Sequence, residues 1–149
     1  MSQLTFTIYG DPRGKGSARA TVRGKFASVY KDGKTRAYEK EIGEIARMAM
    51  GERPPFEGPL VIELIAYFPI PKTTPKKRLA DMVSGFLRPV KKPDLSNVLK
   101  ALEDGCKGTK GKPPIVFLDD SQVVEVHMRK VYSDRPRVWV RIYPWTPKM

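Results

Sequence analysis

Charged side chains with the potential to do chemistry gather in two short stretches of the second half of the sequence. The first contains Asp94, directly after a proline, and Lys100 six residues later. The second contains two adjacent carboxylates, Asp119 and Asp120. Carboxylate oxygens suit a hard divalent cation such as Mg²⁺, and a nearby lysine can stabilise negative charge on a phosphate. The two stretches therefore predict a metal-dependent site for phosphate chemistry.

The local patterns predict how these residues are positioned. Asp94 is a favourable N-cap for a helix that ends near Gly105–Cys106. Its apolar residues recur at i, i+3, i+4 and i+7: Leu95, Val98, Leu99 and Leu102. Asp119 and Asp120 precede a strand-like run at 123–132. Adjacent strand residues point to opposite faces, so both can reach one ion only at a bulge or strand end; otherwise Asp120 binds and Asp119 supports it.

Each of these residues also has a purely structural interpretation. Asp94 can act only as an N-cap, and Lys100 can be a solvated lysine on a helix surface. Asp119 and Asp120 can form a turn, and Asp104 can be the i, i+4 partner of Lys100. The spacing alone leaves both interpretations open.

Composition excludes several classes of protein. The chain has 149 residues, 40% of them hydrophobic, which suits a single globular domain over 1–149. Cys106 is the only cysteine and His127 the only histidine, so an internal disulfide and a Cys/His zinc site are excluded. No apolar run is long enough to span a membrane, and the N-terminus lacks the features of a secretory signal. We therefore expect a cytoplasmic protein in a reducing compartment.

The net charge of +12 predicts a polyanionic partner, most often nucleic acid. Basic residues concentrate in two blocks, 1–36 and 72–92. The glycine-rich segment 10–20 lacks the GK[ST] ending of a phosphate-binding P-loop, so a nucleotide site is rejected there. The candidate nucleic-acid-binding residues are Arg13, Lys15, Arg19, Arg23, Lys91 and Lys92.

The predicted fold class is α+β, a single domain in which helices pack on one face of a mixed β-sheet. The expected strands are 4–9, 60–68, 123–132 and 137–143, and the expected helices are 35–50, 75–83 and 94–105. Thr74 is the expected cap of the second helix. The last two strands are expected to be antiparallel partners joined by the turn SDRP, and 21–30 a small hairpin or irregular crossing.

Two motifs carry a resemblance to a known family. KPDLSNVLKALEDG followed by LDDSQVVEV resembles the RusA family of Holliday junction resolvases, and GDPRGKGSAR is similar to the basic loop of that family. The resemblance implies a homodimeric, magnesium-dependent endonuclease of bacteria or prophages. Such an enzyme nicks branched, four-way DNA junctions symmetrically during recombination and repair.

The resemblance also implies roles for individual residues. Asp94 matches the first aspartate of the family motif, Lys100 the catalytic lysine and Asp120 the essential carboxylate of the aspartate pair. The implied metal ligands are Asp94, Asp119, Asp120 and Asp104. Ser96 departs from the motif, because the best-known members have a second essential aspartate there.

The departure at Ser96 has a chemical consequence. Fewer anionic ligands should weaken magnesium binding, with Mn²⁺ as a possible substitute and Asp104 as a possible compensating ligand. Two alternatives stay open: a non-catalytic DNA-binding protein of the same fold, and a PD-(D/E)xK nuclease. The second ranks last, because Glu125-Val126-His127 lacks the lysine that this motif requires.

Overall fold

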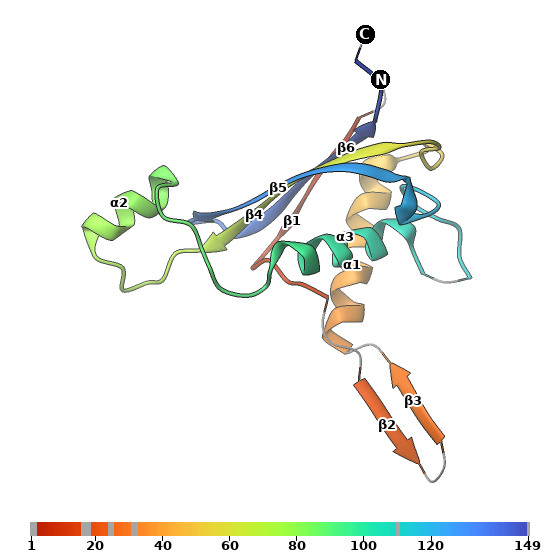
Figure 1. Cartoon of the computed structure of the whole chain (residues 1–149), viewed down its shortest axis with the longest axis horizontal. Helices are drawn as coiled ribbons and strands as arrows, with labels where there is room; N and C mark the ends of the chain where they lie inside the picture. Colours follow the sequence, from red (N-terminus) through yellow and green to blue (C-terminus); the bar gives the residue numbers. More distant parts are fainter. Residues whose placement is uncertain (1–2, 16–18, 24–25, 31–32, 110, 149) are drawn as a thin grey trace.

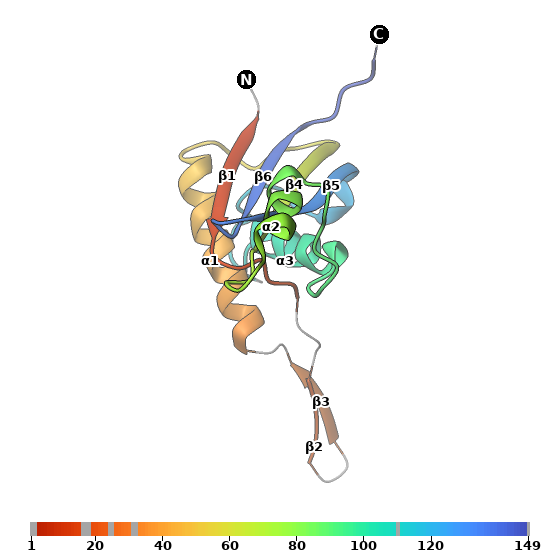
Figure 2. The same cartoon turned by 90° about the vertical axis from the view of Figure 1, so that its left-hand side faces the viewer.

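The computed structural model describes residues 3–15, 19–23, 26–30, 33–109 and 111–148, and only the backbone within 19–23 and 26–30. A twisted sheet forms one layer, and helices α1 and α3 form a second layer on one of its faces (Figures 1 and 2). The elements in chain order are β1 (Leu4–Tyr9), β2 (Arg19–Arg23), β3 (Phe26–Tyr30), α1 (Gly33–Met50), β4 (Leu60–Pro69), α2 (Lys76–Ser84), α3 (Leu95–Lys107), the 3₁₀ turn η1 (Asp120–Gln122), β5 (Val123–Ser133) and β6 (Arg137–Pro144).

The main sheet has the strand order β1-β6-β4-β5. Strand β4 pairs parallel with β5 and antiparallel with β6, and β1 pairs antiparallel with β6. The apolar run of β4 suits this interior place, where from Ile62 onward buried residues alternate with half-buried ones. The prediction of an α+β fold with a mixed sheet and helices on one face is confirmed.

The expected pairing of the last two strands is wrong. Strands β5 and β6 follow each other in the chain, but β4 lies between them. The residues after β5 therefore cross over β4 before β6 begins. Strand β4 offers ten residues of extended backbone whose N–H and C=O groups need partners on both edges, and β5 and β6 supply these partners.

One hydrophobic core joins the sheet to the two helices. It contains the inward-facing residues of β1, β4 and β6 and the buried faces of α1 and α3. The helices approach closely at Gly105 of α3, where an added Cβ would lie only 2.6 Å from Cγ2 of Ile42. A glycine is therefore required here to bring α3 into its place beside α1.

Three further expectations concern the hairpin β2–β3 and the two ends of helix α2. Strands β2 and β3 form an antiparallel hairpin that projects from the end of α1 (Figure 1). Helix α2 begins after Pro75 and ends at Gly85, which has a left-handed conformation (φ 85°). Thr74 is not its cap; its hydroxyl donates to the Pro71 carbonyl at 2.6 Å instead, and so closes the preceding turn.

Candidate catalytic and nucleic-acid-binding site

Helix α3 separates an apolar face from a polar face. The buried residues of this helix are Val98, Ala101, Leu102, Gly105 and Cys106. Ser96, Lys100 and Asp104 lie four residues apart on the other side, where Ser96 and Lys100 are exposed and Asp104 is partly buried. We call these three residues, together with Asp94, the polar strip.

At the N-terminal end of the polar strip, Asp94 occupies the N-cap position of α3. Its side chain makes no capping hydrogen bond to the helix backbone. Instead, the Ser96 hydroxyl donates to Oδ2 of Asp94 at 3.1 Å, and both side chains are exposed. The Asp94 carboxylate is thus oriented by Ser96 and remains open to solvent.

At the C-terminal end of the polar strip, two carboxylates meet around one ammonium group. Nζ of Lys107 lies 4.0 Å from Oδ1 of Asp104 and 3.9 Å from Oδ2 of Asp120. Lys15 donates to Oδ2 of Asp104 at 2.9 Å, and this bond is the main cause of the raised pKa of Lys15. The loop before β2, the end of α3 and the η1 turn therefore converge on one charged cluster.

Glu103 adds a third carboxyl group close to this cluster. Burial, and to a smaller extent the nearby charges of Asp120 and Asp104, raise the pKa of Glu103 to about 7. Lys107 and Lys100 oppose that rise. Like-charged carboxyls at close range compete for the same cations, which is the electrostatic setting that a divalent metal ion relieves.

The two adjacent aspartates have different surroundings: Asp119 caps the η1 turn, and Asp120 belongs to the charged cluster. Asp119 is the N-cap of η1, and its carboxylate accepts hydrogen bonds from the backbone and the hydroxyl of Ser121. These bonds lower the pKa of Asp119. Gln122 closes the turn from the other side, since its Oε1 accepts from the Asp119 N–H at 3.1 Å and its Nε2 donates to the Phe56 carbonyl at 3.0 Å. Asp119 therefore shapes the turn from which Asp120 faces Lys107.

The structure brings some of the predicted ligands together and separates others. Asp104 and Asp120 share Lys107, whereas Asp94 lies ten residues before Asp104, about 15 Å along the helix axis. Among the residues that the structure describes, no three His, Cys, Asp or Glu side chains form a group ready to hold a metal ion. The four carboxylates expected from the sequence are not gathered in one place, and their assignment as ligands stays a prediction.

The donor chemistry of the cluster nevertheless suits magnesium. Mg²⁺ keeps several waters and takes only one or two carboxylates together with substrate phosphate oxygens. Asp104 and Asp120 supply two carboxylates that already lie on either side of a positive charge. Sequence analysis missed Glu103 and Lys107; the run LEDGCK that contains them was the only signal.

The basic loop before β2 is fixed onto α3 rather than free. The Lys15 N–H donates to the Asn97 carbonyl at 3.0 Å. An added Cβ at Gly14 would lie 2.8 Å from Cβ of Asn97 and 3.0 Å from Cβ of Pro93. Only a glycine allows this approach, which holds Lys15 against Asp104.

The other predicted nucleic-acid-binding residues flank the polar strip. Arg13 is exposed on the same loop, and Lys91 and Lys92 are exposed just before Asp94. The side chains of Arg19 and Arg23 lie outside the described part of the structure. Lys15 is engaged by Asp104, so its predicted DNA contact would have to compete with an ion pair.

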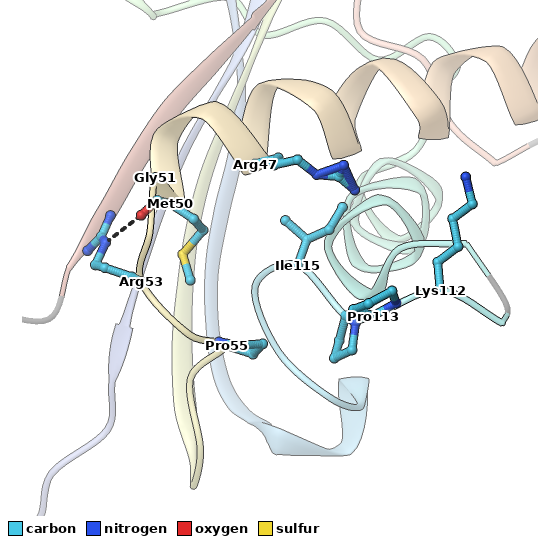
Figure 3. Close-up of a pocket in the computed structure, with 9 residues that line it drawn as sticks. Arg47, Met50, Gly51, Arg53, Pro55, Lys112, Pro113 and Ile115 are labelled. Carbon is cyan, nitrogen blue, oxygen red and sulfur yellow. Dashed lines mark hydrogen bonds between the residues drawn. The ribbon is translucent and has the colours of Figure 1, made fainter.

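A separate pocket of about 380 Å³ lies between the end of α1 and the loop that follows α3 (Figure 3). Arg47 and Lys112 stand on its rim, and Ile115 forms part of its apolar lining. Arg53 is occupied by backbone carbonyls, including that of Met50 at 3.2 Å. No carboxylate lines this pocket, so it supplies no metal ligands.

Comparison with known proteins agrees with these features. The family model described as "Endodeoxyribonuclease RusA" matches residues 10–143. This chain belongs to the RusA endodeoxyribonuclease family. The match covers the basic loop, the polar strip and the η1 turn, so all parts of the candidate site fall within the family region.

A relative from Bacillus subtilis (strain 168) spans nearly the whole RusA-family chain. This protein, "Uncharacterized protein YqaN", is 32% identical over 144 residues, which cover 95% of this chain and 96% of the relative.

Among the described residues, no helix is both long and apolar enough to cross a lipid bilayer.

Proposed function

We propose that this chain is a metal-dependent endodeoxyribonuclease that resolves four-way DNA junctions by paired, symmetric nicks, and that it acts as a homodimer. The supporting observation is the meeting of Asp104 and Asp120 at the end of the polar strip, in a chain of the RusA family. The expected partner is branched DNA, and the expected setting is recombination and repair.

Asp120 and Asp104 are the proposed ligands of Mg²⁺, or of Mn²⁺ as a substitute. When bound, the cation would activate a water molecule and offset charge on the leaving oxygen. Asp119 orients Asp120 through the η1 turn. Asp94 is a further candidate, because its exposed carboxylate makes no capping bond and can hold a cation against the DNA backbone at the other end of the strip.

Lys100 has a different task in this scheme. It lies between the two ends of the polar strip and is exposed, so its ammonium group can approach a phosphate laid along α3. A fixed positive charge there stabilises the extra negative charge of the transition state. Arg13, Lys91 and Lys92 surround the strip and would neutralise neighbouring phosphates, which makes binding dependent on salt.

Cleavage of a labelled four-way junction with and without Mg²⁺ tests the proposal. Asp120→Asn should abolish cleavage while junction binding survives or tightens, because one negative charge near the phosphate is removed. Asp134→Asn, at an exposed position in the turn before β6, is the matched control and should cut normally. A near wild-type cutting rate for Asp120→Asn would refute its assignment.

A non-catalytic DNA-binding protein of the same fold is the second candidate function. Ser96 favours it, since a hydroxyl stands where the best-known relatives carry a carboxylate. This alternative predicts salt-sensitive junction binding with no cleavage at any Mg²⁺ or Mn²⁺ concentration.

A further inference from the structure

An arm formed by residues 70–92 leaves the end of β4, carries α2 and returns to α3. It lies beyond the end of the sheet (Figure 1). Three of its apolar side chains are unusually exposed for their size: Val83, Phe86 and Val90, at 69%, 81% and 97%. They fall within eight consecutive residues of the arm, and we call these three exposed apolar side chains the patch.

The exposure of this patch is fixed by the way the arm is held. Arg88 donates through Nη1 to the Lys130 carbonyl at 3.0 Å and through Nε to the Gly85 carbonyl at 3.0 Å. In return, Nζ of Lys130 donates to the Lys91 carbonyl at 2.6 Å. Pro89 is buried between these two anchor points. Arg88 and Lys91 are thus both held to Lys130 of β5, one on each side of the buried Pro89. This anchored segment leaves the side chains of Phe86 and Val90 exposed to solvent.

The charge around the patch indicates what covers it. Seven basic residues lie within 72–92, against the single acidic residue Asp81: Lys72, Lys76, Lys77, Arg78, Arg88, Lys91 and Lys92. A second copy of the same surface would meet like charge, whereas nucleic acid is complementary in sign. The ligand must also offer apolar faces to Phe86 and Val90, and nucleobases do so once they are unstacked.

We propose that Phe86 and Val90 form an apolar wedge that stacks on unpaired or unstacked bases at the branch point of the DNA. This inference rests on the proposed function, since a branch point supplies bases that are already partly freed from stacking. The surrounding lysines and arginines hold the adjoining phosphates. The wedge would therefore favour branched DNA over a linear duplex, in which every base is stacked on both sides.

The chain connection relates the wedge to the polar strip. Val90 precedes Asp94 by four residues, which can span at most about 14 Å. With about 3.4 Å per nucleotide along one strand, a base at Val90 lies at most about four nucleotides from a phosphate beside Asp94, and a base at Phe86, eight residues before Asp94, at most about eight. The wedge thus limits how far from the branch point cleavage can occur at that end of the strip.

The test measures binding in an Asp120→Asn background, so that cleavage does not interfere. The probe is a four-way junction carrying 2-aminopurine at its branch point, compared with a linear duplex of the same sequence. Phe86→Ala should weaken junction affinity about 5- to 150-fold, the usual range for loss of one base–aromatic stack, and leave duplex affinity unchanged. It should also remove the fluorescence change that accompanies unstacking, and Phe86→Trp should restore both signals.

Met48→Ala is the matched control, because Met48 is 83% exposed on α1, away from the arm. Unchanged junction affinity and fluorescence in a Phe86→Ala, Val90→Ala double variant would overturn the wedge but leave the proposed nuclease intact. Loss of self-association by that variant in sedimentation equilibrium, without DNA, would assign the patch to a second copy and also overturn it. Junction-selective loss in Phe86→Ala by a protein that never cuts would support the wedge and refute the nuclease.

Discussion

Ser96 and Asp94 form the most informative residue pair of the molecule. The Ser96 hydroxyl donates to Oδ2 of Asp94 at 3.1 Å, so it orients a carboxylate without adding charge. A carboxylate at Ser96 would increase the negative potential at this end of the polar strip and attract a divalent cation more strongly. Under the proposed function, we therefore expect the natural serine to give weak metal binding and a high magnesium requirement in cleavage.

We predict that Ser96→Asp lowers the Mg²⁺ concentration needed for half-maximal cleavage, and that Mn²⁺ supports wild-type cleavage at lower concentrations than Mg²⁺. Metal titrations of the cleavage rate measure both effects. Ser96→Asn is the matched control, because it has similar size to aspartate but no charge. Equal metal requirements for the Asp and Asn variants would show that charge at this position does not govern metal binding.

Individual residues also show where sequence reasoning stops. The resemblance to the RusA motifs made Asp104 and Asp120 candidate ligands, but nothing in the sequence indicated that Lys107 would stand between them. Glu103 is equally hidden, because its raised pKa comes from burial and from carboxylates contributed by two separate elements. The position of Lys107 and the pKa of Glu103 both depend on where α3 ends and on the path of the chain from there to η1.

At the level of elements, the docking of the basic loop on α3 links DNA contacts to the acidic cluster. Gly14 lies where a side chain would meet Asn97, and Lys15 beyond it reaches Asp104. The hairpin β2–β3 begins just after this contact and projects from the body (Figure 2).

Gly14→Ala should impair cleavage more than junction binding, because the added methyl pushes the loop away from α3 and breaks the Lys15–Asp104 pair. Cleavage rates and junction affinities of the same variant give the comparison. Gly33→Ala is the control, since an added Cβ at Gly33 meets no atom within 4 Å. Parallel losses of binding and cleavage in Gly14→Ala would mean that the loop serves binding alone.

The elements themselves were largely predictable, and their pairing was not. Periodicity located α1, α3 and all four strands of the main sheet to within about two residues, the usual spread of helix and strand boundaries. The hairpin expected from the SDRP turn failed because a turn signal indicates a change of direction and not which strand lies alongside. That choice depended on β4, whose backbone N–H and C=O groups are paired on both edges, with β5 on one side and β6 on the other.

At the scale of the whole molecule, one chain carries one acidic cluster and several basic surfaces. The loop around Arg13 packs against Pro93 and against Asn97 of α3, so together with Lys91 and Lys92 of the arm it places positive charge at the N-terminal end of the polar strip. One cluster can cut one strand at a time. Under the proposed function, we therefore expect paired nicks in opposite strands to need a second chain, placed by a two-fold axis that matches the symmetry of the junction.

We predict that mixed dimers of wild type and Asp120→Asn make single nicks. On a supercoiled plasmid with an extruded cruciform, paired nicks give linear DNA, whereas one nick releases the supercoiling and leaves a nicked circle. Chains unfolded and refolded together should give mainly nicked circles. The same chains mixed after folding should still give linear DNA from the wild-type dimers that remain. If both mixtures give the same products, the chains act as independent monomers or exchange faster than they cut, and repeating the assay after chemical cross-linking separates these two cases.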